Sequence, residues 1–346
     1  MSHSHPIPVV CRRVAVVGVE AWGRHWISAV EASDRWELAA VVDLDDSALD
    51  WVTRELGVED SLCYKHFDEA LEETTLDAVI LSVPCPQRDP VFEAACQRGL
   101  HCLVEKPSAY GLEQLNHYLD LCRRAGNTVM VAHNFRFADV SRRVQEVVRS
   151  GELGPLNYLH ATVDRHLDLE GRYFEAVAHA ALVESAIQAF DLARMFVDAE
   201  AVSVVARSGN PPASQFKNEP CAAAIVEFPG GRMATIWVSW AAAENTTTWY
   251  GTWDLFFESG ALRTDGRSLR LIREGKATDL VPVRPAVELH LDAVLDHFAD
   301  ALDRGIVPEC DLEENVGSCA IMLAAVESLR TGKVVDVVDF LQRRIR

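Results

Sequence analysis

The stretch Arg13-Val-Ala-Val-Val-Gly-Val-Glu-Ala-Trp-Gly23 decides the fold, because it joins a short valine-rich run to a turn bounded by glycines. In a dinucleotide-binding fold, a glycine at the place of Gly18 permits the tight turn. A glycine at the place of Gly23 lets the following helix pack closely on the strand. Asp43 ends the next apolar run, where an acidic side chain can bind an adenosine ribose. We therefore predict a Rossmann dinucleotide-binding domain over residues 10–133.

Apolar runs alternate with helical stretches through this first part of the chain. Alternation of this kind, with nearly all-apolar strands, indicates an α/β fold with a parallel sheet covered on both faces. The expected strands are 13–17, 38–42, 78–83, 102–104 and 129–132, and the expected helices include 46–56 and 112–125.

The pattern changes after a helix expected over 139–150. Strands that follow one another with period-two alternation indicate a mostly antiparallel, open-faced sheet with one covered face. We predict an α+β substrate and oligomerisation domain over residues 134–346. Its expected strands are 157–163, 201–206, 222–228, 232–240, 253–257 and 269–272, with helices 182–195, 289–302 and 312–329 as the cover.

Glu20 stands where a dinucleotide turn normally has its second glycine, which lets the backbone approach the pyrophosphate. Like charges about 4 Å apart repel by several kcal/mol at an intermediate dielectric. The site is therefore weakened or lost unless the Glu20 carboxylate turns to solvent. No Arg or Lys follows Asp43 within the next few residues, which favours NAD over NADP.

Length, charge and cysteine content argue against several other classes of protein. The 346 residues fit two domains, and the formal net charge of -19 argues against a nucleic-acid partner, because phosphates would be repelled. No apolar window reaches the roughly 20 residues of a membrane span. The nine cysteines include no Cys-x-x-Cys pair, and Met1 to Arg13 has no secretory pattern, so we expect a cytoplasmic protein. We predict no metal site.

The segment Gly99-Leu-His-Cys-Leu-Val-Glu-Lys-Pro107 resembles the most specific motif of the Gfo/Idh/MocA oxidoreductases, and the resemblance covers nearly the whole chain. Members of that family oxidise or reduce sugars, inositols and related polyols with nicotinamide cofactors. Further segments resemble other family motifs. These are Ala21-Trp-Gly23, Asn134-Phe-Arg-Phe137, Gly151-Glu-Leu-Gly154 and Ser328-Leu-Arg-Thr-Gly-Lys-Val-Val335.

The resemblance implies that Lys106 lies between nicotinamide and substrate, where a cation stabilises alkoxide character on the reacting oxygen. It also implies that Arg136, Tyr173 and Asp191 take part in substrate binding. The implied cofactor site contains Gly18, Glu20, Trp22, Gly23, Asp43, Pro84, Arg88, Glu105, Lys106 and Asn134.

The chain departs from the family where protons are handled. The family has Asp-x-x-x-His followed three residues later by Asp, and the matching residues here are Glu184, Gln188 and Asp191. Spacing of four puts positions 184 and 188 on one helix face. The amide of Gln188 can hold a substrate hydroxyl, but it has no pKa near 7 and cannot act as a base. His179 is a candidate for the missing proton function, and Tyr173 is a weaker one.

Two further features carry expectations. Arg88 stands where the family's loop Thr-Pro-x-x-x-His has its histidine. Four tryptophans, Trp237, Trp240, Trp249 and Trp253, fall on the second sheet or its loops. The resemblance implies that the open face of this sheet forms a subunit interface, so we expect the tryptophans there and a homodimer or homotetramer assembled through the sheet.

Two hypotheses remain open from the sequence. The leading one is an NAD-linked oxidoreductase that acts on a sugar, polyol or similar small carbonyl or alcohol substrate. The alternative is a non-redox descendant of the fold, either a ligand-binding protein or a lyase, cyclase or hydrolase that uses Lys106 and Glu184. Glu20 and Gln188 motivate the alternative, because Glu20 replaces the glycine at the pyrophosphate and Gln188 replaces the proton acceptor.

Overall fold

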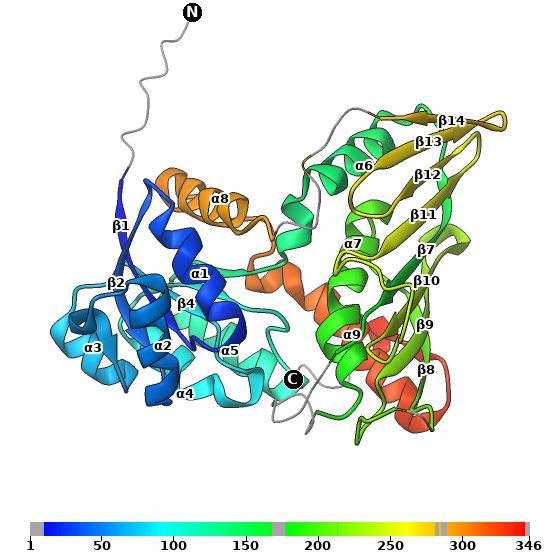
Figure 1. Ribbon diagram of the computed structural model, residues 1–346. Coiled ribbons are helices and arrows are strands. Elements are labelled where there is room, and N and C mark those ends of the chain that lie inside the picture. The colour runs from blue at the N-terminus through cyan, green and yellow to red at the C-terminus, as the bar shows by residue number, and fades with distance from the viewer. Residues whose placement is uncertain (1–9, 168–176, 213, 281–283, 285–288, 343–346) are drawn as a thin grey trace, which may run out of the picture. The chain divides into compact units, whose positions relative to one another are not determined.

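The predicted parallel sheet is present in the computed structural model as six strands in the order β3-β2-β1-β4-β5-β6 (Figure 1). All neighbouring strands are parallel. The order reverses between β1 and β4, and in such sheets ligands bind outside the carboxyl ends of the strands at this point. The strands are β1 Arg12–Val17, β2 Trp36–Val42, β3 Cys63–Tyr64, β4 Ala78–Leu81, β5 His101–Val104 and β6 Val129–Val131.

Helices connect these strands. From β1 the chain moves to β2 and β3 toward one edge of the sheet, and from β4 it moves to β5 and β6 toward the other edge. Because the crossovers are right-handed, α1 and α2 lie on one face of the sheet and α4 and α5 on the other. The helices are α1 Ala21–Glu31, α2 Asp46–Leu56, α3 Phe67–Glu73, α4 Asp89–Gln97 and α5 Leu112–Ala125, with short turns η1 Asp60–Leu62 and η2 Cys85–Gln87.

Helix α8 (Leu291–Arg304) is the main correction to the predicted arrangement. We expected it to cover the second sheet, but it packs against α1 of the first unit. Trp36 stacks on Phe298 with ring centroids 5.5 Å apart, and Arg35 donates to Asp303 at 2.6 Å. The prediction was wrong because an amphipathic pattern shows that a helix buries one face, and does not show which surface it buries against.

The second sheet has nine strands in the order β14-β13-β12-β11-β7-β10-β9-β8-β15. Only the β7–β10 pair is parallel among the described pairs, so the sheet is mostly antiparallel as predicted. The strands are β7 Leu156–Asp164, β8 Ser203–Gly209, β9 Cys221–Phe228, β10 Arg232–Ser239, β11 Thr252–Phe257, β12 Ala261–Thr264, β13 Leu269–Arg273, β14 Lys276–Asp279 and β15 Val335–Asp336.

Helices cover one face of this sheet. Every residue of α7 is buried, and α7 contacts β7 and β10. Ser328 of α9 accepts a hydrogen bond from the Ala206 amide of β8 at 3.0 Å, which ties α9 to the same sheet. The elements are η3 Asn134–Phe137, α6 Asp139–Ser150, the π-helical η5 Ala181–Ala186, α7 Ile187–Val197, η6 Pro229–Gly231, α9 Leu312–Thr331 and α10 Val337–Gln342.

The tryptophans of the second sheet do not share one environment. Trp240 and Trp253 are each only 1% exposed within the chain itself. The interface expectation is therefore wrong for these two, because their indoles already fill the core under the helices. Trp237 lies on the opposite face, 39% exposed, and Trp249 is half-buried in a loop.

The structure describes residues 10–167, 177–212, 214–280, 284 and 289–342. The chain divides into two compact units: a first unit of residues 1–109, 114–132 and 291–315, and a second unit of residues 110–113, 133–290 and 316–346. Within the described ranges, we find no helix with both the length and the apolar character needed to cross a membrane.

Candidate functional site

The glycine turn after β1 is built for close packing. Gly18 has a φ of 87°, which favours glycine, and a Cβ there would lie 2.8 Å from the backbone nitrogen of Val83. A Cβ on Gly23 would lie 1.9 Å from the Gly18 carbonyl oxygen. Both positions therefore require glycine, so that β1, β4 and α1 can meet at the place where a pyrophosphate would bind.

Glu20 and Asp43 lie on this turn. The Glu20 side chain is exposed and makes no capping hydrogen bond at the start of α1. Asp43 accepts from the Val19 amide at 2.7 Å and from the Asp45 amide at 2.9 Å, so its carboxylate fixes the turn from the end of β2. The turn fits a dinucleotide as long as the Glu20 carboxylate stays in solvent.

Arg24 is a cation near this turn that the sequence analysis missed. Its Nε donates to the Val19 carbonyl at 3.1 Å, and its guanidinium lies 3.8 Å from the centroid of the Trp51 ring. Arg24 directly follows Gly23, whereas the cofactor prediction rests on the residues after Asp43.

Lys106 follows β5 in a turn supported from below by Glu105. The buried Glu105 carboxylate accepts from the Trp26 indole at 2.8 Å and from the Lys106 amide at 3.2 Å. Burial raises the pKa of Glu105, although the nearby Lys106 charge opposes this shift. Lys106 is half-buried, and its Nζ lies 5.9 Å from the centroid of the Trp22 ring. This brings Trp22 and Lys106 together in the first unit.

Arg88, in the place of the family's histidine, is 1% exposed. Its guanidinium donates to the Pro107 carbonyl at 2.8 Å and to the Val83 carbonyl at 3.0 Å. Its hydrogen bonds therefore go to the backbone of the Lys106 turn and of the Pro84 loop. Arg88 links the Lys106 turn to Val83, the residue packed against Gly18.

Gln188 lies in a hydrogen-bonded cluster in the second unit. Its amide oxygen lies 3.0 Å from Nδ1 of His133, and its amide nitrogen donates to Asn134 at 2.7 Å. Because an amide oxygen can only accept, Nδ1 of His133 carries the proton. Asn134 in turn donates to the Leu289 carbonyl at 2.8 Å. These contacts fix which end of the Gln188 amide points in which direction.

Glu184 belongs to η5, immediately before α7. Its carboxylate accepts a short hydrogen bond from the Tyr110 hydroxyl. Glu184 is only 6% exposed. Single π-helical turns are rare and frequently mark functional sites. Tyr110 was not among the predicted site residues, although it stands only four positions after Lys106.

Arg136 and Asp191, both predicted to bind substrate, form a buried ion pair. Arg136 donates through Nε at 2.6 Å and through Nη2 at 2.7 Å, and Ser318 donates to the same carboxylate at 2.7 Å. Burial alone would raise the pKa of Asp191, but the Arg136 guanidinium and His133 bring it well below its usual range. The pair joins η3 to α7 and therefore holds the Gln188 cluster in place.

His179 lies apart from the Gln188 cluster in its contacts. Its Nδ1 lies 3.1 Å from a Glu219 carboxylate oxygen and 3.2 Å from the Ser208 hydroxyl. Its φ of 54° lies in the left-handed region, which favours glycine. Tyr173, the weaker substitute, lies outside the described residues.

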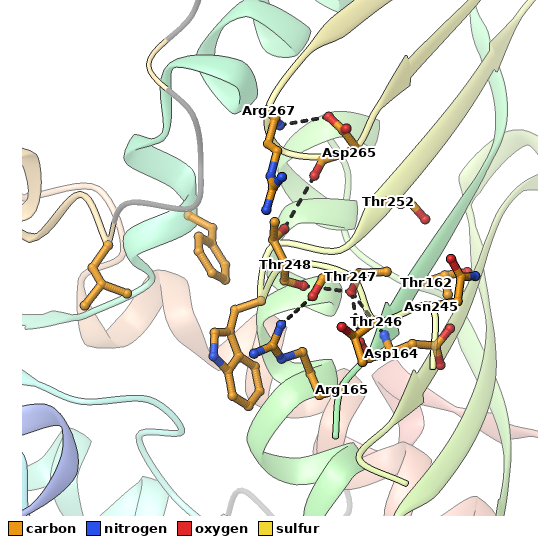
Figure 2. Close-up of a pocket in the computed structure, with 13 residues that line it drawn as sticks. Thr162, Asp164, Arg165, Asn245, Thr246, Thr247, Thr248, Thr252, Asp265 and Arg267 are labelled. Atoms are coloured by element: carbon orange, nitrogen blue, oxygen red, sulfur yellow. Dashed lines mark hydrogen bonds between the residues drawn. The ribbon is translucent and has the colours of Figure 1, made fainter. Parts of the chain in front are cut away.

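A pocket of about 570 Å³ opens in the second unit beside η3 (Figure 2). It lies where β7 and β11 meet a threonine-rich loop and the turn between β12 and β13. Its lining includes Phe135, Arg165, Thr246, Trp249, Thr252 and Arg267. Sequence reasoning did not identify this pocket, because its residues come from separate strands and loops with no shared motif.

The parallel sheet and its glycine turn define a class of protein, those with a Rossmann-type dinucleotide-binding domain. Comparison with known families agrees. Residues 12–133 match the oxidoreductase family with an NAD-binding Rossmann fold, and residues 141–263 match the GFO/IDH/MocA C-terminal domain. The chain belongs to the Gfo/Idh/MocA family of oxidoreductases. Membership favours the redox hypothesis over the non-redox alternative.

Several characterised proteins are similar to this chain over most of their length. It is 27% identical to D-xylose 1-dehydrogenase (NADP(+)) 2 of Haloferax volcanii, covering 90% of this chain and 95% of that one. It is 26% identical to scyllo-inositol 2-dehydrogenase (NAD(+)) of Bacillus subtilis, covering 94% and 96%. The fold also matches an Agrobacterium radiobacter oxidoreductase in complex with NAD+, L-tartaric acid and magnesium. That match has a TM-score of 0.86 at 21% identity and covers 95% of this chain and 99% of that one.

Proposed function

We propose that the protein is an NAD-linked dehydrogenase that acts on a sugar, polyol or related small hydroxy or carbonyl compound. One continuous set of contacts within the first unit supports this. Gly18 packs on Val83, the Val83 carbonyl accepts from Arg88, and Arg88 donates to Pro107 beside Lys106. The dinucleotide turn and the catalytic lysine are therefore held in a fixed relation, as hydride transfer requires.

Lys106 is the proposed catalytic residue. The nicotinamide, when bound, supplies the hydride acceptor or donor. The Lys106 ammonium hydrogen-bonds the reacting oxygen and stabilises its negative charge as the carbon changes oxidation level. Trp22 shields one side of the lysine from water, and Glu105 and Arg88 act as positioning residues that fix the turn.

The second unit supplies substrate orientation and proton handling in this proposal. The Gln188 amide, oriented by His133 and Asn134, hydrogen-bonds a substrate hydroxyl. Glu184 is the proposed proton acceptor of the second unit, and the hydrogen bond from Tyr110 fixes the position of its carboxylate. Arg136 and Asp191 hold this cluster and do not themselves contact the substrate. His179 has no role in the chemistry.

We propose NAD as the preferred cofactor. The Asp43 carboxylate at the end of β2 is suited to the ribose hydroxyls and would repel a 2′-phosphate. Arg24, stacked on Trp51, is the one described cation that contacts this turn and favours NADP. The two characterised relatives named above divide between the cofactors, one using NADP+ and the other NAD+. The relative affinities for NAD+ and NADP+, measured on the same preparation, test this choice.

We propose assembly through the outer face of the second sheet, as a homodimer or as a homotetramer with one further interface. Tyr158, Ile225, Met233 and Trp237 are all more than one-third exposed there. Tyr158 stacks on Phe256 of the neighbouring strand, with centroids 4.4 Å apart. Exposed apolar side chains that form one patch are typical of a subunit interface. Light scattering on the native protein and on a Trp237→Glu variant tests this proposal.

We also propose a cytoplasmic location. All nine cysteines are free in the structure, although Cys96 and Cys102 lie close enough for the Asn127 amide to contact both sulfurs, at 3.7 and 3.8 Å. Free thiols at this density persist in a reducing compartment.

Titration of the protein with NADH, followed by nicotinamide fluorescence, tests the proposed function. We expect saturable binding in the micromolar to millimolar range. Absence of binding at millimolar cofactor would overturn the proposal and would return the non-redox hypothesis to first place.

A further inference from the structure

The pocket in the second unit contains an arginine whose charge is not balanced within the described chain. The Arg165 Nη1 donates a short hydrogen bond to the Thr247 carbonyl, and its guanidinium lies 4.8 Å from the centroid of the Trp249 ring. Its Nε is buried and has no hydrogen-bond partner among the residues the structure describes. The Nε–Nη2 edge, which pairs with both oxygens of a carboxylate, is therefore unused within those residues.

The two acidic residues of the pocket already accept hydrogen bonds from other groups. Asp164 accepts from the Trp237 indole at 2.9 Å on the outer face of the sheet. Asp265 accepts from the Arg267 and Ser268 amides, both at 2.9 Å, and thereby forms the turn between β12 and β13. Within the described ranges, neither carboxylate pairs with Arg165. Burial also lowers the pKa of Arg165, as expected for a cation with no anion beside it.

The rest of the lining suits a polyhydroxy ligand. The Thr246 and Thr252 hydroxyls have no side-chain partner in the described part of the chain. The half-buried Trp249 supplies an apolar surface for the C–H face of a sugar chain. Figure 2 shows Arg267 extending from its turn toward Thr248, so a second cation reaches this pocket.

Two arginines, Arg165 and Arg267, line this pocket in a chain whose formal net charge is -19. Cations brought together on an acidic chain favour an anionic ligand over a neutral sugar.

We propose that this pocket binds a polyhydroxy carboxylate, a sugar acid of the aldonate or uronate class, with its carboxylate against the Arg165 guanidinium. The identification of this compound as the substrate rests on the proposed function, whereas the binding itself does not. A carboxylate forms charge-assisted hydrogen bonds with a guanidinium, which a neutral hydroxyl cannot match.

Calorimetric titration with D-gluconate and with D-glucitol tests this, because the two compounds differ only at the carbon that carries the carboxylate. We expect the cofactor-free native protein to bind gluconate at least about tenfold more tightly, and this preference to weaken with added salt. The Arg165→Met variant should lose the preference. Arg270→Met, in which an exposed arginine paired with Asp279 is removed, should keep it.

If the native protein binds gluconate and glucitol equally well, the inference is wrong, and no variant is needed to show it. A preference that persists in a folded Arg165→Met protein would also overturn it. Tighter binding of D-glucose 6-phosphate than of gluconate would show a phosphate site and contradict the carboxylate assignment. NADH titration on the same sample separates these outcomes from failure of the proposed function, because it reports on the first unit alone.

Discussion

Nδ1 of His133 lies 3.0 Å from the amide oxygen of Gln188, so an imidazole stands directly behind the position where the family has its catalytic histidine. His133 is fully buried, whereas Gln188 is 8% exposed. We therefore expect His133 to affect a substrate only through the amide that it orients, as a positioning residue.

This arrangement predicts non-additive effects at the two positions. Gln188→Leu removes the proposed contact to the substrate and should lower kcat/KM by about 10- to 100-fold, the range expected for a lost hydrogen bond in a buried site. His133→Asn frees the amide to rotate and should lower kcat/KM by a smaller factor. The double variant should resemble Gln188→Leu alone, because His133 acts through Gln188.

Steady-state kinetics of the three variants measure this coupling. Simple multiplication of the two single effects would show that His133 acts independently and would contradict the positioning role. Gln188→His is an informative companion. Higher activity with a steeper pH profile would show that the cluster still accepts a base at this position.

Lys106→Met should abolish most turnover and leave cofactor affinity nearly unchanged. Loss of a group that stabilises charge only in the transition state lowers kcat by about 10²- to 10³-fold. The matched control is Lys65→Met, in which an exposed lysine paired with Asp46 is removed. Equal loss in both variants, or a large loss of NADH affinity in Lys106→Met, would contradict the catalytic assignment.

Glu20→Gln should tighten NADH binding, because it removes a negative charge near the pyrophosphate without changing the size of the side chain. The expected gain is about 1 kcal/mol at low ionic strength, and it should shrink as salt is added. Glu20→Gly should gain at least as much. Glu31→Gln, at the far end of α1, is the control. An unchanged affinity in both Glu20 variants would show that the exposed carboxylate does not reach the phosphates.

Asp191→Asn should destabilise the protein by about 3–5 kcal/mol at neutral pH, because it leaves the buried Arg136 without its counter-ion. The pKa of Asp191 is lowered in the folded state, so its stabilising contribution is fully present above the unfolded value of about 4. That contribution is lost as the pH falls below this value. Denaturant unfolding from neutral to acidic pH should therefore show the difference between the native protein and the variant narrowing on the acid side. If the difference in unfolding free energy between the native protein and Asp191→Asn stays constant across this pH range, the ion-pair account is wrong. Adding Arg136→Met to the Asp191→Asn variant should restore part of the stability, because it removes the unpaired buried charge.

Local features of the sequence were enough to predict the first sheet and the glycine turn. Each depends on residues close together in the chain, such as Gly18 and Gly23. The packing of α8 could not be predicted in this way, because the stacking of Phe298 on Trp36 joins residues far apart in the sequence. The pattern of α8 is equally compatible with either unit.

The site shows the same division. The resemblance to the family motif pointed to Gln188 and Glu184, but their partners His133 and Tyr110 are joined to them only by tertiary contacts. Arg88 matched a family position, yet its burial under the Lys106 turn depends on the path of the backbone carbonyls it binds. Arg165 has no motif at all, and only the folded loop around Trp249 reveals its unused edge.

The central claim is that the protein carries out hydride transfer at Lys106. The direct measurement is the appearance of NADH fluorescence when the protein and NAD+ are mixed with a panel of polyols, aldoses and sugar acids. Our account predicts NADH formation with at least one compound by the native protein and its loss in Lys106→Met. A native protein that binds NADH but forms none with any member of the panel, or activity that survives in Lys106→Met, would contradict it.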